Sequence, residues 1–165
     1  PALPEAIAEK YTAEGVPTTP AQILVTPGAQ HALNIVLRAL AGKQDRVLVE
    51  HPTYPNALDA IRAAGCKPLP GALPSGTSPA WDIDGMVATM NQQRPAVAYL
   101  VPDFHNPTGR IMTDLQRRRL TRAAAASGTV LVVDETLRGL NLDGVRTAPM
   151  SSFSPAVVSI GSLSK

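Results

Sequence analysis

The chain has 165 residues, which suffices for one domain with a sizeable core, because a chain of this size removes roughly 70% of its unfolded surface from water. Apolar residues make up 44% of it and charged residues 17%, and no apolar run approaches the roughly 18 residues of a membrane span. Fifteen basic and thirteen acidic residues give a net charge of +2, which indicates neither disorder nor a nucleic-acid-binding surface.

Cysteine and histidine residues are few in this chain, and the histidines lie far apart in the sequence. Cys66 is the single cysteine, so neither an internal disulfide nor a cysteine-based metal site is expected. His31, His51 and His105 lie on separate segments without metal-ligand spacing, so no metal site is predicted. The N-terminus shows no signal segment, and a reducing, cytoplasmic setting is the expectation.

Short runs rich in Val, Ile and Leu alternate with amphipathic stretches, the pattern of βαβ units around a parallel sheet. In chain order we predict a helix over 3–14, a strand over 23–26, a helix over 29–41, a strand over 46–50, a helix over 55–64, a strand over 66–69, a helix over 82–93, a strand over 96–101, a helix over 113–127, and strands over 129–134 and 157–161. Residues 71–80, rich in Pro, Gly and Ser, are expected to form a loop. The predicted class is α/β, with helices covering both faces of a mostly parallel sheet.

The helix predicted over 113–127 carries three consecutive arginines and an alanine run. Its apolar side chains are expected to form a buried stripe that consists of Leu115, Leu120, Ala123 and Ala124. Arg117, Arg118 and Arg122 are expected to face water.

Ligands of open α/β sheets bind in the crevice beyond the carboxyl ends of the strands. Gly28, Ala29 and Gln30 stand at such a strand-to-helix junction, where free backbone amides at the positive end of a helix dipole suit a phosphate. An ordinary tight turn would use the same residues. Tyr54 follows the next strand, where its ring either covers a flat ligand or packs in the core.

Two charged residues follow strongly apolar strands. Asp134 ends the run 130–133, so its carboxylate needs a cationic or hydrogen-bonding partner. It either caps the following turn or pairs with a protonated ring nitrogen or a metal. Lys165 follows the strand over 157–161 and is either an exposed charge or, in a dry crevice, a nucleophile towards carbonyls.

Three motifs in a fixed order then stand out: Glu50-x-Pro52-x-Tyr54, Asn106-Pro107-Thr108-Gly109 and Ser162-x-Ser164-Lys165. Together with the turn at Gly28 and with Asp134, this set resembles the fold-type-I pyridoxal 5'-phosphate enzymes, specifically the class I/II aminotransferases. The resemblance runs over essentially the whole chain and implies the large domain of that fold, a three-layer αβα arrangement.

The resemblance implies a role for each residue of the set. Gly28, Ala29, Gln30 and Ser162 would contact the cofactor phosphate, Tyr54 would stack on the pyridine ring, and Asn106 would donate to the phenolic oxygen. Asp134 would keep the pyridine nitrogen protonated. Lys165 would form the internal aldimine and move the proton during catalysis. One departure is Leu137, where the family commonly has a tyrosine that bonds the phenolic oxygen.

Segments 3–8, 18–26, 101–109 and 160–165 look most like the MocR-type members of the GntR family, transcriptional regulators with an aminotransferase-like domain. That branch implies an effector domain whose ligand is an amino acid or amine. A free-standing aminotransferase that acts on an amino acid and a 2-oxo acid is the alternative. The resemblance also implies a homodimer of the full-length protein, and DNA binding only through a domain outside this chain.

Because the family's large domain continues beyond the lysine, residues 1–165 are expected to be one partial cofactor-binding domain. A C-terminal small domain and any N-terminal winged helix-turn-helix would then lie outside it, and the isolated chain is expected to bind the cofactor weakly. Ser162-x-x-Lys165 also matches the nucleophile motif of penicillin-binding acyltransferases, but the Ser-Asp-Asn and Lys-Thr-Gly elements are missing. A Gly-x-Gly-x-x-Gly dinucleotide motif is missing as well.

Overall fold

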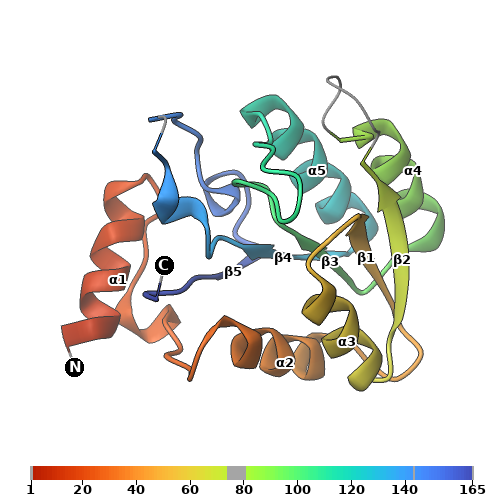
Figure 1. Ribbon diagram of the computed structural model, residues 1–165, viewed down its shortest axis with the longest axis horizontal. Coiled ribbons are helices and arrows are strands. Elements are labelled where there is room, and N and C mark those ends of the chain that lie inside the picture. The colour runs from red at the N-terminus through yellow and green to blue at the C-terminus, as the bar shows by residue number, and fades with distance from the viewer. Residues whose placement is uncertain (1, 74–80, 143, 165) are drawn as a thin grey trace.

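A sheet of five parallel strands lies between two helical layers (Figure 1). The structure, a computed structural model, describes residues 2–73, 81–142 and 144–164. The spatial order of the strands is β2-β1-β3-β4-β5. Their bounds are β1 (Arg46–His51), β2 (Lys67–Ala72), β3 (Val97–Leu100), β4 (Val130–Asp134) and β5 (Val157–Ile160). The predicted class and the parallel sheet are confirmed.

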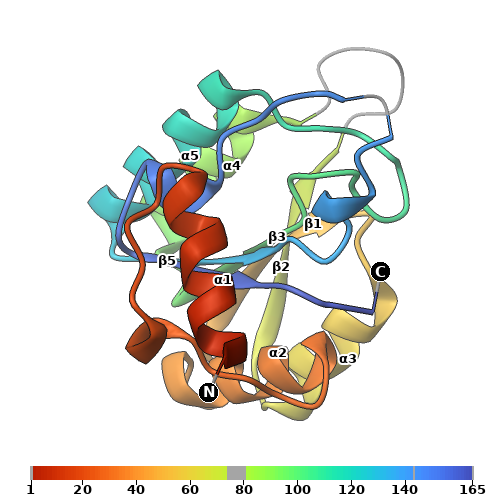
Figure 2. The same ribbon diagram turned by 90° about the vertical axis from the view of Figure 1, so that its left-hand side faces the viewer.

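The helices begin and end within two residues of the predicted positions. They are α1 (Ala2–Ala13), α2 (Ala29–Leu40), α3 (Pro55–Ala63), α4 (Ile83–Gln93) and α5 (Asp114–Ser127). Helices α2 and α3 cover one face of the sheet and α4 and α5 the other, while α1 lies beside β5 (Figures 1 and 2). The sequence sets these bounds through local signals: Thr113 and Gln116 form a capping box at the start of α5, and Gly128 ends it at a φ of 75°.

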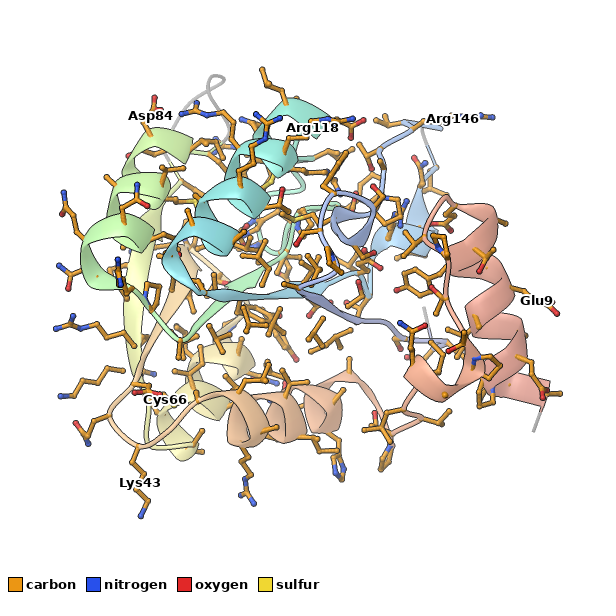
Figure 3. The ribbon with its side chains drawn as sticks, turned by 180° about the vertical axis from the view of Figure 1, so that it is seen from behind. Glu9, Lys43, Cys66, Asp84, Arg118 and Arg146 are labelled. Atoms are coloured by element: carbon orange, nitrogen blue, oxygen red, sulfur yellow. The ribbon has the colours of Figure 1, made fainter. Side chains whose placement is uncertain are left out.

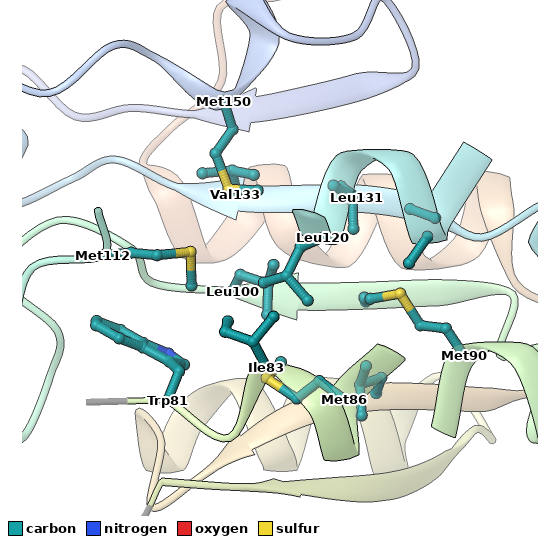
Figure 4. Packing of buried hydrophobic residues seen from close by; sticks show 14 of the residues in the cluster. Trp81, Ile83, Met86, Met90, Leu100, Met112, Leu120, Leu131, Val133 and Met150 are labelled. Atoms are coloured by element: carbon teal, nitrogen blue, oxygen red, sulfur yellow. The ribbon is translucent and has the colours of Figure 1, made fainter. Parts of the chain in front are cut away.

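Each face of the sheet has its own apolar core. Between the sheet and α4 and α5, Trp81, Met86, Leu120 and Leu131 belong to one cluster of buried side chains (Figure 4). The second core, which we call the α2/α3 core, contains Leu33, Leu37, Val47, Val49, Ala57, Ile61, Val97, Tyr99, Val132 and Ile160. Since successive strand residues point to opposite faces, burial on both sides explains the continuous apolar runs of the sequence.

The strand predicted over 23–26 is wrong. These residues follow a short 3-10 helix over Pro20–Gln22 and pair with none of the five strands. Leu24 is 72% exposed and Val25 53% exposed. An apolar, β-branched run has strand propensity, but a strand also needs a neighbouring backbone, and none of the described residues supplies one here.

Two side chains of α5 have exchanged their predicted environments. Leu115 is 70% exposed, whereas Arg117 is fully buried. The guanidinium of Arg117 pairs with both carboxylate oxygens of Asp103, at 2.6 and 3.2 Å, and donates to the carbonyl groups of Met112, Pro102 and Ala148. All five of its N–H groups are used, which explains why this arginine can be buried. Arg118 lies at the surface as predicted (Figure 3), with its guanidinium over the ring of Phe153.

Candidate functional site

Ligands of open α/β sheets bind at the carboxyl ends of neighbouring strands from which the chain continues in opposite directions. In this sheet β1 and β3 are such a pair, because β1 leads to β2 on one side and β3 leads to β4 on the other. The predicted site residues gather along this edge. Tyr54 follows β1, Asn106 follows β3, Asp134 ends β4 and Ser162 follows β5. No helix of the described residues is long and apolar enough to cross a membrane.

The turn before α2 leaves backbone amides free at the start of a helix. Gly28 has a φ of 102°, a conformation that favours glycine, and its carbonyl oxygen accepts the amides of His31 and Ala32 at 3.1 Å. The amides of Ala29 and Gln30 donate to no group of the described residues. Since they stand at the positive end of the α2 dipole, they form a site suited to an anion.

Asn56 connects this turn to Tyr54. The side-chain amide of Gln30 donates to the carbonyl oxygen of Asn56 at 3.2 Å, and the side-chain amide of Asn56 donates to the Tyr54 hydroxyl at 2.9 Å. Tyr54 packs against the α2/α3 core while it remains half-buried. The packing of Tyr54 in the core is thus confirmed, and its place over a flat ligand stays a prediction.

Asp134 lies on the same face of the sheet as that site. Tyr99 pairs with Val132 in the register of β3 and β4, so the side chains of Tyr99, Val132 and Asp134 point toward the α2/α3 core. The Tyr99 hydroxyl donates to Oδ2 of Asp134 at 2.6 Å, and the amide of Thr136 donates to Oδ1 at 2.9 Å. The expectation of a hydrogen-bonding partner for this carboxylate is confirmed, and the carboxylate caps its turn as well.

The Asn106 turn rests on a buried polar network that the sequence did not reveal. Glu50 is fully buried, accepts the indole N–H of Trp81 at 2.7 Å and accepts the amide of Val101 at 2.8 Å. Nε2 of His105 lies 3.2 Å from Oε2 of Glu50, at ion-pair distance without hydrogen-bond alignment, and its Nδ1 lies 2.9 Å from the Thr108 hydroxyl. Glu50 thus holds the backbone directly after β3, and His105 bonds Thr108 inside the turn that carries Asn106.

The remaining predicted site residues are Asn106, Ser162 and Lys165. The Asn106 side chain is exposed and forms no hydrogen bond within the described residues. Ser162 is half-buried, and its hydroxyl lies 2.8 Å from that of Ser164 and accepts the Ser164 amide at 3.2 Å. Lys165 lies outside the described residues, so its role stays a prediction.

Glu135, next to Asp134, joins the site to α1. The Tyr11 hydroxyl donates to its Oε2 at 2.6 Å, and the Arg138 guanidinium lies 3.9 Å from its Oε1. Burial raises the pKa of Glu135, and the nearby charges of Asp103 and Glu14 add to this, against the opposing effects of Tyr11 and Arg138. Glu135 therefore binds a proton more readily in the folded chain than in the unfolded chain.

This shift gives the stability of the protein a pH dependence of known sign. Because the folded pKa is the higher one, the contribution of Glu135 to the free energy of unfolding is full below its ordinary pKa of 4.5 and is lost as the pH rises through the folded pKa. Urea denaturation of Glu135→Gln from pH 4 to 7 should show that the variant gains stability relative to wild type as the pH rises. Glu9→Gln, on the exposed side of α1 (Figure 3), should show no such trend. A constant difference between Glu135→Gln and wild type would contradict this assignment.

Comparison with protein families and known proteins agrees with this geometry. The family described as aminotransferase class I and II matches residues 1–165. The 2-aminoadipate transaminase of Thermus thermophilus is 31% identical over 94% of this chain and 40% of that protein. The uncharacterised HTH-type transcriptional regulator YdfD of Bacillus subtilis is 29% identical over 99% of this chain and 34% of that protein. The chain thus spans about two fifths or less of the length of these relatives.

Solved structures show the same fold. LysN, an α-aminoadipate aminotransferase of Thermus thermophilus solved in complex with N-(5'-phosphopyridoxyl)-L-leucine, superposes with a TM-score of 0.82 and 30% identity over 96% of this chain and 41% of that one. N-succinyldiaminopimelate aminotransferase of Mycobacterium tuberculosis gives a TM-score of 0.87 and 25% identity over 99% and 44% of the two chains. The predicted fold is confirmed, and the chain belongs to the class I and II aminotransferase family, whose cofactor is pyridoxal 5'-phosphate.

Proposed function

We propose that this chain is the cofactor-binding part of an effector domain in a MocR/GntR-type transcriptional regulator, where pyridoxal 5'-phosphate takes up an amino acid or amine ligand. The observation that carries the cofactor assignment is the convergence of three groups on one face of the sheet. They are the free amides of Ala29 and Gln30, the half-buried ring of Tyr54 and the carboxylate of Asp134.

These groups fit a flat, phosphorylated pyridine. The α2 N-terminus with Ser162 would bind the phosphate, Tyr54 would lie on the ring, and the unpaired amide of Asn106 would donate to the ring oxygen. Asp134 would hold a proton at the ring nitrogen, and Lys165 would bind the aldehyde carbon covalently. When bound, the cofactor supplies an electron sink for bonds at the amino-bearing carbon of the ligand.

The regulator assignment is supported by Leu137 and by the relatives. Leu137 precedes the short 3-10 helix Arg138–Leu140, and its side chain cannot donate the hydrogen bond that a tyrosine gives there in many aminotransferases. HTH-type regulators of Escherichia coli and Bacillus subtilis match 92% to 99% of this chain. Binding of the ligand would then change the arrangement of the full-length protein, a cytoplasmic homodimer that contacts DNA through a domain outside this chain.

A free-standing aminotransferase is the second candidate. The observation in its favour is that the identity to 2-aminoadipate transaminase, at 31%, exceeds that to the three regulators, at 25% to 29%. Such an enzyme would transfer the amino group of an amino acid to a 2-oxo acid through the same residues.

The full-length protein, loaded with pyridoxal 5'-phosphate, separates the two candidates. Single amino acids and amines are tested for a change in affinity for DNA upstream of its own gene, and the same compounds are tested for turnover with 2-oxo acids. The proposal predicts a ligand-dependent change in DNA affinity. Sustained turnover by a protein that does not bind DNA would contradict the proposal and support a free-standing aminotransferase.

A further inference from the structure

Tyr99 is a polar residue inside an otherwise apolar strand. It is the next-to-last residue of β3, is fully buried, and its neighbours along the strand are Ala98 and Leu100. Phenylalanine would fill the same volume within the α2/α3 core. The hydroxyl has one hydrogen-bond partner among the described residues, Oδ2 of Asp134 at 2.6 Å. The hydroxyl therefore contributes a hydrogen bond to the Asp134 carboxylate, in addition to the packing of the ring.

This hydroxyl is fixed as a donor. Burial and the charge of Asp134 raise the pKa of Tyr99 far above its ordinary value, so its hydroxyl keeps its proton at neutral pH. Because Thr136 donates to the other oxygen, each Asp134 oxygen has one donor among the described residues, and the plane of the carboxylate is set from two sides.

We propose that Tyr99 is a positioning residue of the cofactor site. Its hydroxyl would orient the Asp134 carboxylate and reduce the negative charge that this carboxylate presents to the ring nitrogen of the cofactor. The inference rests on the proposed function, since it assigns Tyr99 a role only if Asp134 binds the cofactor. It makes the hydroxyl of Tyr99 a determinant of how strongly the site favours the protonated forms of the bound cofactor.

Few other titratable groups act on Tyr99. The titratable groups that act on Tyr99 are Asp134 itself, Glu50 and Tyr54. Glu135 follows Asp134 in the chain, and it has an equivalent partner in Tyr11, whose hydroxyl donates to it at 2.6 Å. Tyr11 therefore offers a matched comparison: the same hydroxyl, the same length of bond, and a carboxylate one residue further along the chain.

The test uses the full-length protein loaded with pyridoxal 5'-phosphate, as wild type, Tyr99→Phe and Tyr11→Phe. The absorbance of the bound cofactor is measured against pH. The midpoint of the transition between its protonated and deprotonated forms is compared among the three proteins. Without the Tyr99 donor, Asp134 carries more uncompensated negative charge, which favours protonated groups nearby, so the transition should move upward by about half a pH unit in Tyr99→Phe. In Tyr11→Phe it should stay at the wild-type pH.

An unmoved or downward-moving transition in Tyr99→Phe, or an equal upward shift in Tyr11→Phe, would overturn the inference. Cofactor binding by wild type would still uphold the cofactor assignment on which the proposed function rests. A wild-type protein that takes up no cofactor would contradict both. Should Tyr99→Phe fail to fold, 3-fluorotyrosine at position 99 keeps the volume and strengthens the donor, and the transition should then move downward. An upward or absent shift with 3-fluorotyrosine would equally overturn the inference.

Discussion

Replacement of Asp134 by asparagine in the full-length protein is expected to weaken binding of pyridoxal 5'-phosphate about ten- to hundredfold, the scale of one lost hydrogen bond between charged groups. Asparagine keeps the shape of the side chain and one oxygen, so the bond from Tyr99 or from Thr136 can survive. It removes the negative charge, however, and with it the partner of a protonated ring nitrogen. Titration of the cofactor into the apoprotein, followed by absorbance, measures the change.

The matched control is Asp59→Asn, the same chemical change on the exposed side of α3. Asp59 is 75% exposed, and its ion pair with Arg62 spans 3.5 Å, so its removal should leave the dissociation constant of the cofactor unchanged. Equal affinity of Asp134→Asn and wild type would show that Asp134 does not face the cofactor.

Replacement of Arg117 by methionine is expected to lower the free energy of unfolding by about 3–5 kcal/mol, the usual cost of breaking a buried ion pair. The change leaves the carboxylate of Asp103 in the protein interior with the Thr147 hydroxyl at 2.9 Å and the Arg138 guanidinium at 3.9 Å. It also frees the carbonyl groups of Met112, Pro102 and Ala148. Because Asp103 begins the loop that carries Asn106, cofactor binding should weaken as well.

Arg122→Met on the same helix is the control. Arg122 is exposed and forms no ion pair within the described residues, so this variant should stay within about 0.5 kcal/mol of wild type in urea denaturation. Arg117→Met combined with Asp103→Asn should recover part of the loss, because the double variant leaves no unpaired charge. A double variant less stable than Arg117→Met would contradict this explanation.

The fold could be predicted from the sequence because its signals are local. Apolar runs mark five strands, and the glycine at position 128 and the capping box at Thr113 mark the ends of α5. The run over 23–26 shows the limit of such signals: it has the composition of a strand, but pairing depends on a neighbour that the composition does not specify.

The polar contacts of the site could not be predicted because they join residues far apart in the sequence. Tyr99 and Asp134 meet only through the register of β3 and β4, and Arg117 meets Asp103 only after α5 packs on the sheet. One signal was available: Tyr99 and Asp134 both stand near the carboxyl ends of strands that would be neighbours in a parallel sheet. Glu50 was visible in the sequence as part of a motif, but its partners Trp81 and His105 lie far away in the chain and could not be read from it.

Borohydride reduction of the full-length protein in the presence of pyridoxal 5'-phosphate tests the central claim most directly. The account predicts a yellow protein whose long-wavelength band is bleached by borohydride, and a peptide that carries the phosphopyridoxyl group on Lys165. Asp59→Asn should behave in the same way. A protein that stays colourless at saturating cofactor, or a label on Lys10, Lys43 or Lys67 instead of Lys165, would contradict the account.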